Sequence, residues 1–443
     1  MKNASISMDR IAAMRNAFAQ NGERVMRMNA VTKTGMDSAI AFDAPIRTPN
    51  TFSHELKSGD VTAQNGSGRC WLFAATNILR LEVMKKCDLE TFEISQAYLF
   101  FWDKFEKANY YLESVIETVD EPLDSRIIAW LLSAPFNDGG QWDMVVALVE
   151  KYGVVPKNVM PESFSTGSSG AMNKILTLKA REYARDLRNA HKAGATREAL
   201  AQKKASMMDE IFGILCTCMG VPPMTFDFEV RGKEGKFTRQ MNMTPQAFYS
   251  EYVGTPLKDY VSLINSPTTD KPFYQTYTVS FLGNVIEGDP ILYLNLPIEN
   301  VKRAALAQLM DGRPVWFGSD VGQMHNREHG LMDMDAYDYG AVFMTNFGLN
   351  KGERLQYGES LMTHAMVFTG VNELDGTPNR WKVENSWGEK AGVKGWFRMS
   401  DAWFDEYVYQ IVVDKRYLAQ DELSALSKAP IALNPWDPMG SLA

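Results

Sequence analysis

The chain is poor in cysteine and histidine and has no long apolar run. It holds four cysteines and five histidines among 443 residues, so a disulfide framework like that of small secreted domains is not expected. No stretch reaches the about 18–20 uninterrupted apolar residues that a bilayer-spanning helix needs. The first ten residues lack the apolar segment of a signal peptide. We therefore expect a soluble, cytoplasmic protein without a membrane partner.

Positive charge is also scarce. Lys and Arg number 46 against 54 Asp and Glu, which gives a formal net charge of −8. A general nucleic-acid surface needs clustered Lys and Arg, so nucleic-acid binding is not expected. Apolar residues make up 45% of the chain, which is enough for a large core or for two or three domains.

The segment 64–71, Gln-Asn-Gly-Ser-Gly-Arg-Cys-Trp, indicates a catalytic cysteine. A cysteine nucleophile needs a base to form the thiolate and a hydrogen-bond donor for the oxyanion that its attack creates. The Gln64 amide and the backbone N–H of Cys70 can be such donors. The apolar run after Cys70 has helical spacing, so the thiol would lie at a helix N-terminus, where the helix dipole favours a thiolate. A buried structural cysteine is the alternative, and the spacing to Gln64 favours catalysis.

The base and its orienting group are predicted in the last fifth of the chain. His364 begins an apolar, β-branched segment that is typical of a strand, and residues 372–378 carry a hairpin turn signal. The following strand-like segment leads to Asn385, so an antiparallel hairpin can bring Asn385 close to His364. The asparagine oxygen can then accept a hydrogen bond from one ring nitrogen and leave the other aimed at the thiol. Trp387 can shield this bond from water.

These segments resemble the signature blocks of papain-like cysteine peptidases, in the order of that family. The blocks are Gln64, Cys70-Trp71, His364-Ala365 and Asn385-Ser386-Trp387-Gly388. Residues 137–142, Asn-Asp-Gly-Gly-Gln-Trp, resemble the Gly-Gly loop of the substrate cleft. Segments 94–104 and 434–443 resemble, more narrowly, the bleomycin hydrolase and bacterial aminopeptidase C branch. The resemblance runs from about residue 50 to the end.

The resemblance implies an α+β, two-lobed papain-like fold. We expect an N-terminal helical extension (1–49), a helical lobe with the cysteine (50–165), a large mixed insertion (166–300), a β-barrel-like lobe with the histidine and asparagine (301–418) and a C-terminal arm in the cleft (419–443). Cys70 and His364 are 294 positions apart, about twice the separation in the smallest relatives. Because members of this branch form hexameric rings, the insertion is expected to serve assembly of a homohexamer.

The implied function is a cytoplasmic cysteine aminopeptidase that acts on peptides with a free N-terminus, with bleomycin-type amide hydrolysis as a side activity. Cys70 is the expected nucleophile, His364 the base, Asn385 its orienting group and Gln64 an oxyanion donor. Substrate contacts are expected from Gly139, Gly140, Trp387 and Ala443. Neither a cofactor nor a metal is expected. Secreted members carry a disulfide-forming cysteine three residues before the nucleophile, whereas this chain has Ser67 there, which suits a reducing compartment.

The last thirty residues are expected to form an arm without further strands, because the strand pattern ends near Val413. A frayed terminus is the common fate of such a segment. Against that, burying Trp436, Met439 or Leu442 is worth roughly 1.5–3 kcal/mol each. The family resemblance implies that this arm blocks longer peptides and that the Ala443 carboxylate pairs with the α-amino group of the substrate.

Three alternatives compete with this interpretation. Residues 325–329, His-Asn-Arg-Glu-His, match an inverted zinc-peptidase motif, but that motif needs a helix and glycines bracket the segment. Cys216 and Cys218 suggest a metal or redox pair, yet their apolar helical surroundings favour core packing. The non-enzymatic alternative is a binding or chaperone-like ring with a vestigial site. The four filled catalytic positions argue against it.

Overall fold

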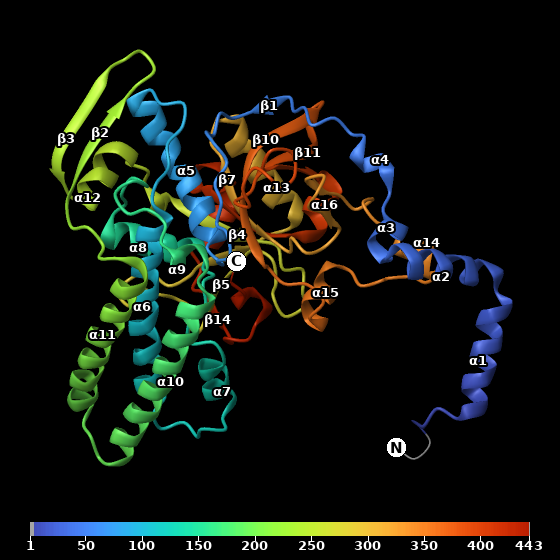
Figure 1. The fold of residues 1–443 in the computed structure, drawn as a ribbon, viewed down its shortest axis with the longest axis horizontal. Helices are drawn as coiled ribbons and strands as arrows, with labels where there is room; N and C mark the ends of the chain where they lie inside the picture. Colours follow the sequence, from blue (N-terminus) through green and yellow to red (C-terminus); the bar gives the residue numbers. More distant parts are fainter. Residues whose placement is uncertain (1–3, 443) are drawn as a thin grey trace.

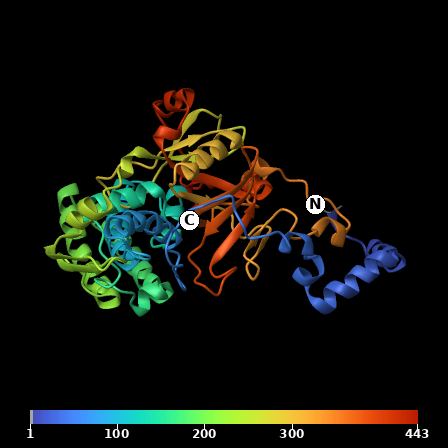
Figure 2. The same cartoon turned by 90° about the horizontal axis from the view of Figure 1, so that it is seen from above.

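The computed structural model describes residues 4–442. The substrate contact predicted for Ala443 therefore lies outside the described residues. Helices and strands separate into a helical lobe and a sheet lobe that lie side by side (Figures 1 and 2). One hydrophobic core fills the helical lobe and continues onto the sheet, and a second core lies within the sheet lobe. The expected α+β fold class is confirmed.

Three helices form the centre of the helical lobe, and two long helices cover it. The central ones are α5 (Cys70–Cys87), α6 (Gln96–Glu117) and α8 (Trp142–Tyr152), and the covering ones are α10 (Gly170–Lys192) and α11 (Arg197–Met219). Helix α7 (Arg126–Ser133) lies at the edge of this lobe (Figure 1), and its buried residues are Ile128 and Leu131. Most of the α5 side chains are buried, as expected for a helix that is apolar on every face. At the start of α6, the Ser95 hydroxyl accepts a hydrogen bond from the Tyr98 amide, a typical N-cap.

Twelve strands among the described residues form one mixed sheet, in which β7, β10 and β11 are central neighbours. Their bounds are β1 (His54–Glu55), β4 (Tyr260–Ile264), β5 (Gln275–Val279), β6 (Tyr293–Asn295), β7 (Val315–Ser319), β8 (His325–Asn326), β9 (Leu331–Met332), β10 (His364–Leu374), β11 (Thr377–Glu384), β12 (Trp396–Ser400), β13 (Val408–Asp414) and β14 (Ile431–Leu433). The predicted hairpin is present, since β10 and β11 pair antiparallel with Val367 opposite Glu384.

The segment 166–300 contributes to both lobes. Helices α10 and α11 pack against α6, and β4 pairs with β13 in the large sheet. A separate hairpin, β2 (Phe226–Arg231) and β3 (Phe237–Met243), lies at the edge of the helical lobe (Figure 1), and α12 (Pro245–Phe248) with a π-helical turn (Tyr249–Val253) follows it. Phe228 and Phe248 of these elements pack edge to face with ring centroids 4.9 Å apart.

The remaining helices are short or lie on the sheet lobe. Helix α13 (Ile298–Met310) packs against β10 and β13. The others are α3 (Met36–Ile40), α4 (Asp43–Ile46), α9 (Phe164–Gly167), α14 (Tyr339–Phe343), α15 (Lys351–Tyr357), α16 (Asp401–Tyr407) and α17 (Gln420–Leu426). None of the helices between residues 4 and 442 is long and apolar enough to cross a membrane.

The N-terminal helices α1 (Met8–Gln20) and α2 (Gly22–Thr34) project from the sheet lobe (Figure 1) and bury none of their residues. Their apolar side chains Met8, Met14 and Met26 are exposed. The predicted helical character of this segment is confirmed. Amphipathic helices in water gain most of their stability from packing of the apolar face, and within one chain these two helices have little to pack against.

The prediction that the strands end near Val413 is wrong. Helix α17 follows β13, and β14 then pairs parallel with β5, with Ile431 opposite Tyr277. A strand of three residues shows no alternation that a sequence pattern can reveal, and the pairing edge lies about 150 residues earlier in the chain. After β14 the chain forms only a 3₁₀ turn at Pro438–Gly440 within the described residues.

Candidate active site

Cys70 is the first residue of α5, and its side chain lies at a cavity of about 890 Å³ between the two lobes. The next residue, Trp71, is fully buried and donates from its indole nitrogen to the Asp138 carbonyl at 2.7 Å. A Cβ atom at Gly140 would lie 2.6 Å from the Trp71 ring. The glycine therefore lets the Gly-Gly loop pack directly on the helix that carries the thiol.

The hydrogen bond between His364 and Asn385 joins the two central strands. His364 is the first residue of β10, Asn385 directly follows β11, and the imidazole Nε2 lies 2.8 Å from the Asn385 Oδ1. That oxygen also accepts from the Ser386 amide at 2.7 Å. Because Oδ1 can only accept, Nε2 carries the proton, and Nδ1 is the ring nitrogen left for the thiol. The Trp387 ring lies 4.9 Å from the imidazole centroid and covers it.

The Cys70 thiol lies beside the start of β10, within reach of a hydrogen bond from the Ala365 amide. Burial raises the pKa of the Cys70 thiol to about 11, and the amides of Ala365, Trp71 and Cys70 oppose this effect. Burial lowers the pKa of the His364 imidazole to about 4, and the bond to Asn385 partly offsets that change. Between those two pH values the Cys70 sulfur and Nδ1 of His364 share one titratable proton, in addition to the proton on Nε2.

Gln64 lies at the same cavity with its side-chain amide held at both ends. The Nε2 group donates to the Ser67 carbonyl at 2.6 Å, and Oε1 accepts from the Ser386 hydroxyl at 2.6 Å. One hydrogen of Nε2 remains for a ligand in the cavity. The backbone N–H of Cys70 is among the first of α5, and such groups have no partner within the helix. Two N–H donors and a thiol are therefore available at one site.

The C-terminal segment forms part of the cavity wall. Residues of this segment that line the cavity are Pro435, Trp436, Asp437, Pro438, Gly440, Ser441 and Leu442. The Ser441 carbonyl accepts from Gln141 Nε2, and the Ser441 hydroxyl donates to the Met362 carbonyl, both at 2.7 Å. This double attachment ties the end of the chain to the Gly-Gly loop on one side and to the entry of β10 on the other.

Two further contacts and one buried side chain hold the same segment. A nearly buried ammonium, that of Lys271, pairs with the Asp437 carboxylate at 2.9 Å. The Arg126 guanidinium lies over the Trp436 ring, 4.0 Å from its centroid. Met439 is only 3% exposed. The tail is thus held at Trp436, Asp437, Met439 and Ser441 and is not frayed.

Two of the predicted substrate contacts do not line the cavity. Gly139 does line it, whereas Gly140 packs behind it on Trp71, and Trp387 packs against the His364 ring. The Arg327 guanidinium lies over the Trp387 ring, 4.7 Å from the centroid. In this structure Trp387 therefore screens the imidazole from water, as its position after Asn385 suggested.

Asp138 is a cavity residue that no sequence pattern singles out. Its carboxylate accepts from the Gly68 amide at 3.0 Å and pairs with the buried Lys104 ammonium at 2.7 Å. Burial raises the pKa of Asp138, but Lys104 and the Gly68 amide outweigh burial and hold that pKa below its usual range. The one signal in the sequence is that Asp138 directly precedes the Gly-Gly pair. Its partners Lys104 and Gly68 lie 34 and 70 residues earlier in the chain, and no sequence spacing links them to Asp138.

The inverted zinc-peptidase motif has no helical geometry. Residues 325–329 form the two-residue strand β8 and a turn, so the two histidines are not one helical turn apart. His325 is packed between the Phe397 and Trp387 rings, while His329 is exposed. Residues 4–442 contain no group of three His, Cys, Asp or Glu side chains that could hold a metal ion. The segment is a short strand and a turn of the sheet lobe, and none of its residues lines the cavity.

Comparisons with known proteins give the family of the chain. The model of the peptidase C1-like family matches residues 5–440. Aminopeptidase C of Listeria monocytogenes is 46% identical over 439 residues, 99% of each chain, and bleomycin hydrolase of Mus musculus is 43% identical over 455 residues, 100% of each chain. The crystal structure of PepW from Lactobacillus rhamnosis HN001 superposes with a TM-score of 0.97 at 46% identity, and the match covers all of both chains.

Proposed function

Since the chain belongs to the peptidase C1-like family, we propose that it releases N-terminal amino acids from peptides by thiol catalysis in the cavity between its lobes. Full-length similarity to aminopeptidase C identifies it as a cysteine-type aminopeptidase. The observation that carries the proposed mechanism is the 2.8 Å bond between His364 and Asn385 at the cavity that also holds Cys70 and Gln64.

In the proposed reaction, the Cys70 thiol gives its proton to Nδ1 of His364 while the sulfur attacks the scissile carbonyl carbon. The Gln64 amide and the Cys70 backbone N–H donate hydrogen bonds to the oxyanion. His364 then passes its proton to the leaving amine, and a thioester remains on the sulfur. A water molecule attacks this thioester with His364 as base, which releases the amino acid and restores the thiol. Asn385 keeps the imidazole oriented throughout.

The C-terminal segment accounts for the preference for a free N-terminus. Seven residues between Pro435 and Leu442 line the cavity, and Ser441 is fixed by two hydrogen bonds. We propose that this segment leaves room for a single substrate residue before the scissile bond, and that the Ala443 carboxylate pairs with the substrate's α-amino group. A buried charge pair of this kind is worth several kcal/mol when one partner is removed.

A panel of aminoacyl fluorogenic amides, each with and without an N-acetyl cap, tests this function. We expect the free amines to be hydrolysed. The capped compounds are expected to show a kcat/KM that is at least about 100-fold lower, since capping removes the charge that pairs with the tail. Comparable kcat/KM values for capped and free compounds would show that the enzyme is not an aminopeptidase. The same panel reports the side-chain preference for the first residue.

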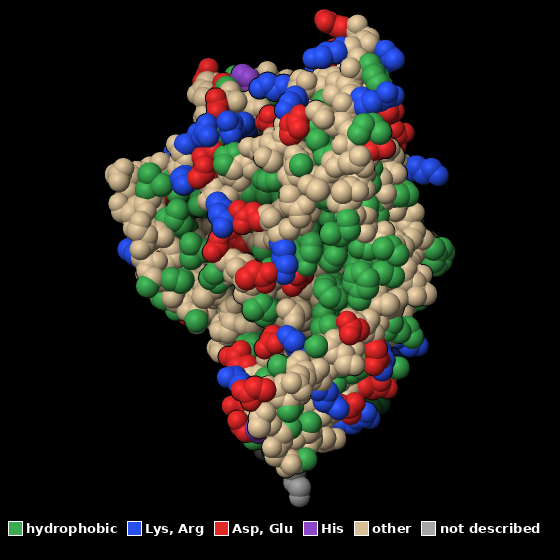
Figure 3. Space-filling view, turned by 90° about the vertical axis from the view of Figure 1, so that its left-hand side faces the viewer, with side chains coloured by type: hydrophobic (Ala, Val, Ile, Leu, Met, Phe, Trp, Pro, Cys, Tyr) green, Lys and Arg blue, Asp and Glu red, His purple; other side chains and the backbone are tan. Residues whose placement is uncertain are grey.

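We further propose a homohexamer. Helices α1 and α2 bury nothing within one chain and expose apolar side chains, which supports an assembly role. On the helical side of the molecule, apolar side chains also gather in the middle of the face (Figure 3). Light scattering at working concentration is expected to give about 300 kDa, six times the 49.9 kDa chain. A mass near that of one chain would reject the hexamer.

The setting proposed for this activity is the cytoplasm. All four cysteines are unbonded, which suits a reducing compartment. On the face that Figure 3 shows, Lys and Arg side chains are interspersed with Asp and Glu, so we propose peptides and not nucleic acids as partners. The mouse relative is named bleomycin hydrolase, and we propose amide hydrolysis of that type as a side activity.

A further inference from the structure

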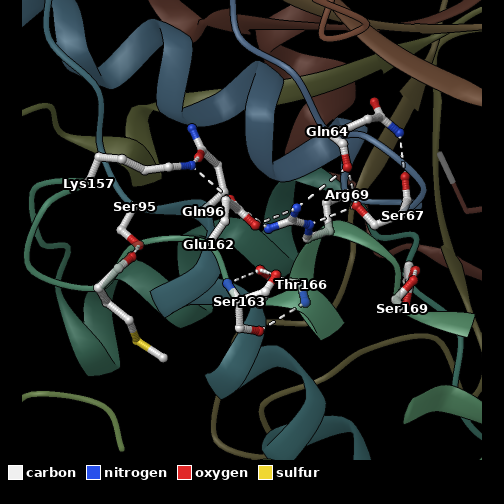
Figure 4. A network of polar contacts seen from close by, with 12 residues as sticks. Gln64, Ser67, Arg69, Ser95, Gln96, Lys157, Glu162, Ser163, Thr166 and Ser169 are labelled. Carbon is white, nitrogen blue, oxygen red and sulfur yellow. Dashed lines mark hydrogen bonds and ion pairs between the residues drawn. The ribbon is translucent and has the colours of Figure 1, made fainter. Parts of the chain in front are cut away.

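A buried cation immediately precedes the nucleophile. The Arg69 side chain is fully buried. Its guanidinium forms a two-point ion pair with Glu162, with nitrogen–oxygen distances of 3.1 and 2.9 Å (Figure 4). It also lies over the Phe73 and Phe100 rings, 5.1 and 5.3 Å from their centroids. Burying a charge is costly unless it is paired and fully hydrogen-bonded. The contacts of Arg69 should therefore show what the buried cation does.

The hydrogen bonds of Arg69 lead to Gln64. The guanidinium Nε donates to the Ser67 hydroxyl at 2.8 Å, and this hydroxyl donates to the Gln64 carbonyl at 2.7 Å. A guanidinium Nη2 approaches the same carbonyl at 3.5 Å. The Ser67 carbonyl in turn accepts from Gln64 Nε2 at 2.6 Å. Arg69 therefore closes the loop between Gln64 and Cys70 into a compact ring of hydrogen bonds (Figure 4).

The other end of the network is fixed in the helical lobe. Lys157 donates to Glu162 at 2.7 Å and to Gln96 of α6 at 2.8 Å. Directly after Glu162, Ser163 and Thr166 bond to each other reciprocally as the capping box of α9. Arginine suits this role because its planar fork binds the carboxylate at two points and still has Nε free for Ser67. Lysine would offer a single point charge.

We propose that Arg69 is a positioning residue for oxyanion stabilisation: through Ser67 it holds the Gln64 amide in the orientation in which its free N–H points into the cavity. This inference rests on the proposed function, in which Gln64 is an oxyanion donor. Glu162 neutralises the charge of Arg69, so Arg69 acts through geometry. The pKa of the Cys70 thiol is shifted by burial, by three backbone amides and by the Asp138 charge, so the role proposed for Arg69 does not depend on that pKa.

Two reactions of the same thiol separate positioning of Gln64 from damage to Cys70. Peptide hydrolysis passes through an oxyanion, whereas alkylation by iodoacetamide displaces iodide at a saturated carbon and forms none. For Arg69→Met we expect kcat to fall about 10- to 100-fold, toward the loss of about 100- to 1,000-fold that removal of an oxyanion donor causes. KM and the alkylation rate constant at neutral pH are expected to stay within about twofold of wild type.

Ser67→Ala breaks the relay but keeps the ion pair between Arg69 and Glu162, so it serves if Arg69→Met does not fold. It is expected to lower kcat about 10-fold, again without a change in alkylation. In the Gln64→Ala background, Arg69→Met is expected to cause no further loss, since residues that act through one another are non-additive. Additive losses would overturn the proposal.

Arg188→Met is the matched control, because Arg188 is a nearly buried arginine that donates to the Thr118 carbonyl, at 3.0 Å, and to that of Glu121. It is expected to lower the melting temperature without changing the ratio of kcat to alkylation rate. A parallel fall of kcat and alkylation in Arg69→Met and Ser67→Ala, or an unchanged kcat in both, would overturn the proposal. Failure of the thiol mechanism itself would show separately, as turnover that survives removal of Cys70.

Discussion

Replacement of Cys70 by alanine is expected to abolish hydrolysis and to leave the fold intact. In the proposed reaction the sulfur forms the covalent thioester, and loss of a nucleophile costs at least about 10⁴-fold in kcat. The substitution removes one atom from a side chain that faces a cavity, so little packing is lost. The measurement is kcat on a free-amine fluorogenic amide, with the thermal melting curve as the check on folding.

Cys87→Ala is a suitable control for that experiment. Cys87 is the last residue of the same helix. It is nearly buried but does not line the cavity. It is expected to retain wild-type kcat with at most a modest loss of stability. If Cys70→Ala kept wild-type turnover, the thiol mechanism would be eliminated. The site would then be vestigial, and another group would have to carry the chemistry.

Deletion of Ser441–Ala443 is expected to change the substrate class. The truncated chain loses both hydrogen bonds of Ser441, to Gln141 and to Met362, and opens one end of the cavity. Free-amine substrates lose the partner of their charge, so their kcat/KM is expected to fall about 100-fold. N-acetylated amides and internal peptide bonds gain access. The measurement is the ratio of kcat/KM for capped and free forms of one amide.

Leu442→Ala is the matched variant for the deletion, because it keeps the length of the chain and the attachment of Ser441. It is expected to go on rejecting capped substrates. A truncated enzyme with the same strict N-terminal specificity as wild type would refute the role given to the tail. Internal cleavage of an unstructured protein, followed by mass spectrometry, would confirm that the deletion has opened the cleft to longer chains.

The parts of the fold that could be predicted are those that depend on local pattern. The helix from Cys70 follows from a continuous apolar run, and the hairpin that brings Asn385 to His364 follows from two β-branched segments around a turn. Gln64 was recognisable from its fixed spacing to Cys70. In each case the relevant contact is either close in sequence or enforced by strand pairing. The structure places all four of these side chains at one cavity or next to it.

The parts that could not be predicted depend on contacts between distant segments. Strand β14 exists because β5 offers it an edge, and its three residues carry no pattern of their own. Asp138 binds Gly68 and Lys104, and Arg69 binds Glu162, through polar contacts between residues far apart in the sequence. Ionic and hydrogen-bonded partners have no period along the chain, so a charged residue of this kind looks like a solvated one until the fold is known. The positioning of the catalytic loop rests on such contacts.

The pH dependence of Cys70 alkylation tests the pairing of thiol and imidazole most directly. In wild type we expect the iodoacetamide rate constant to be nearly flat from about pH 5 to about pH 9 and to fall below it with a pKa near 4, since burial lowers the pKa of His364 to about 4. In His364→Ala we expect the rate to rise about tenfold per pH unit through pH 9, because burial raises the pKa of the lone thiol to about 11. Identical profiles for the two proteins would contradict the account.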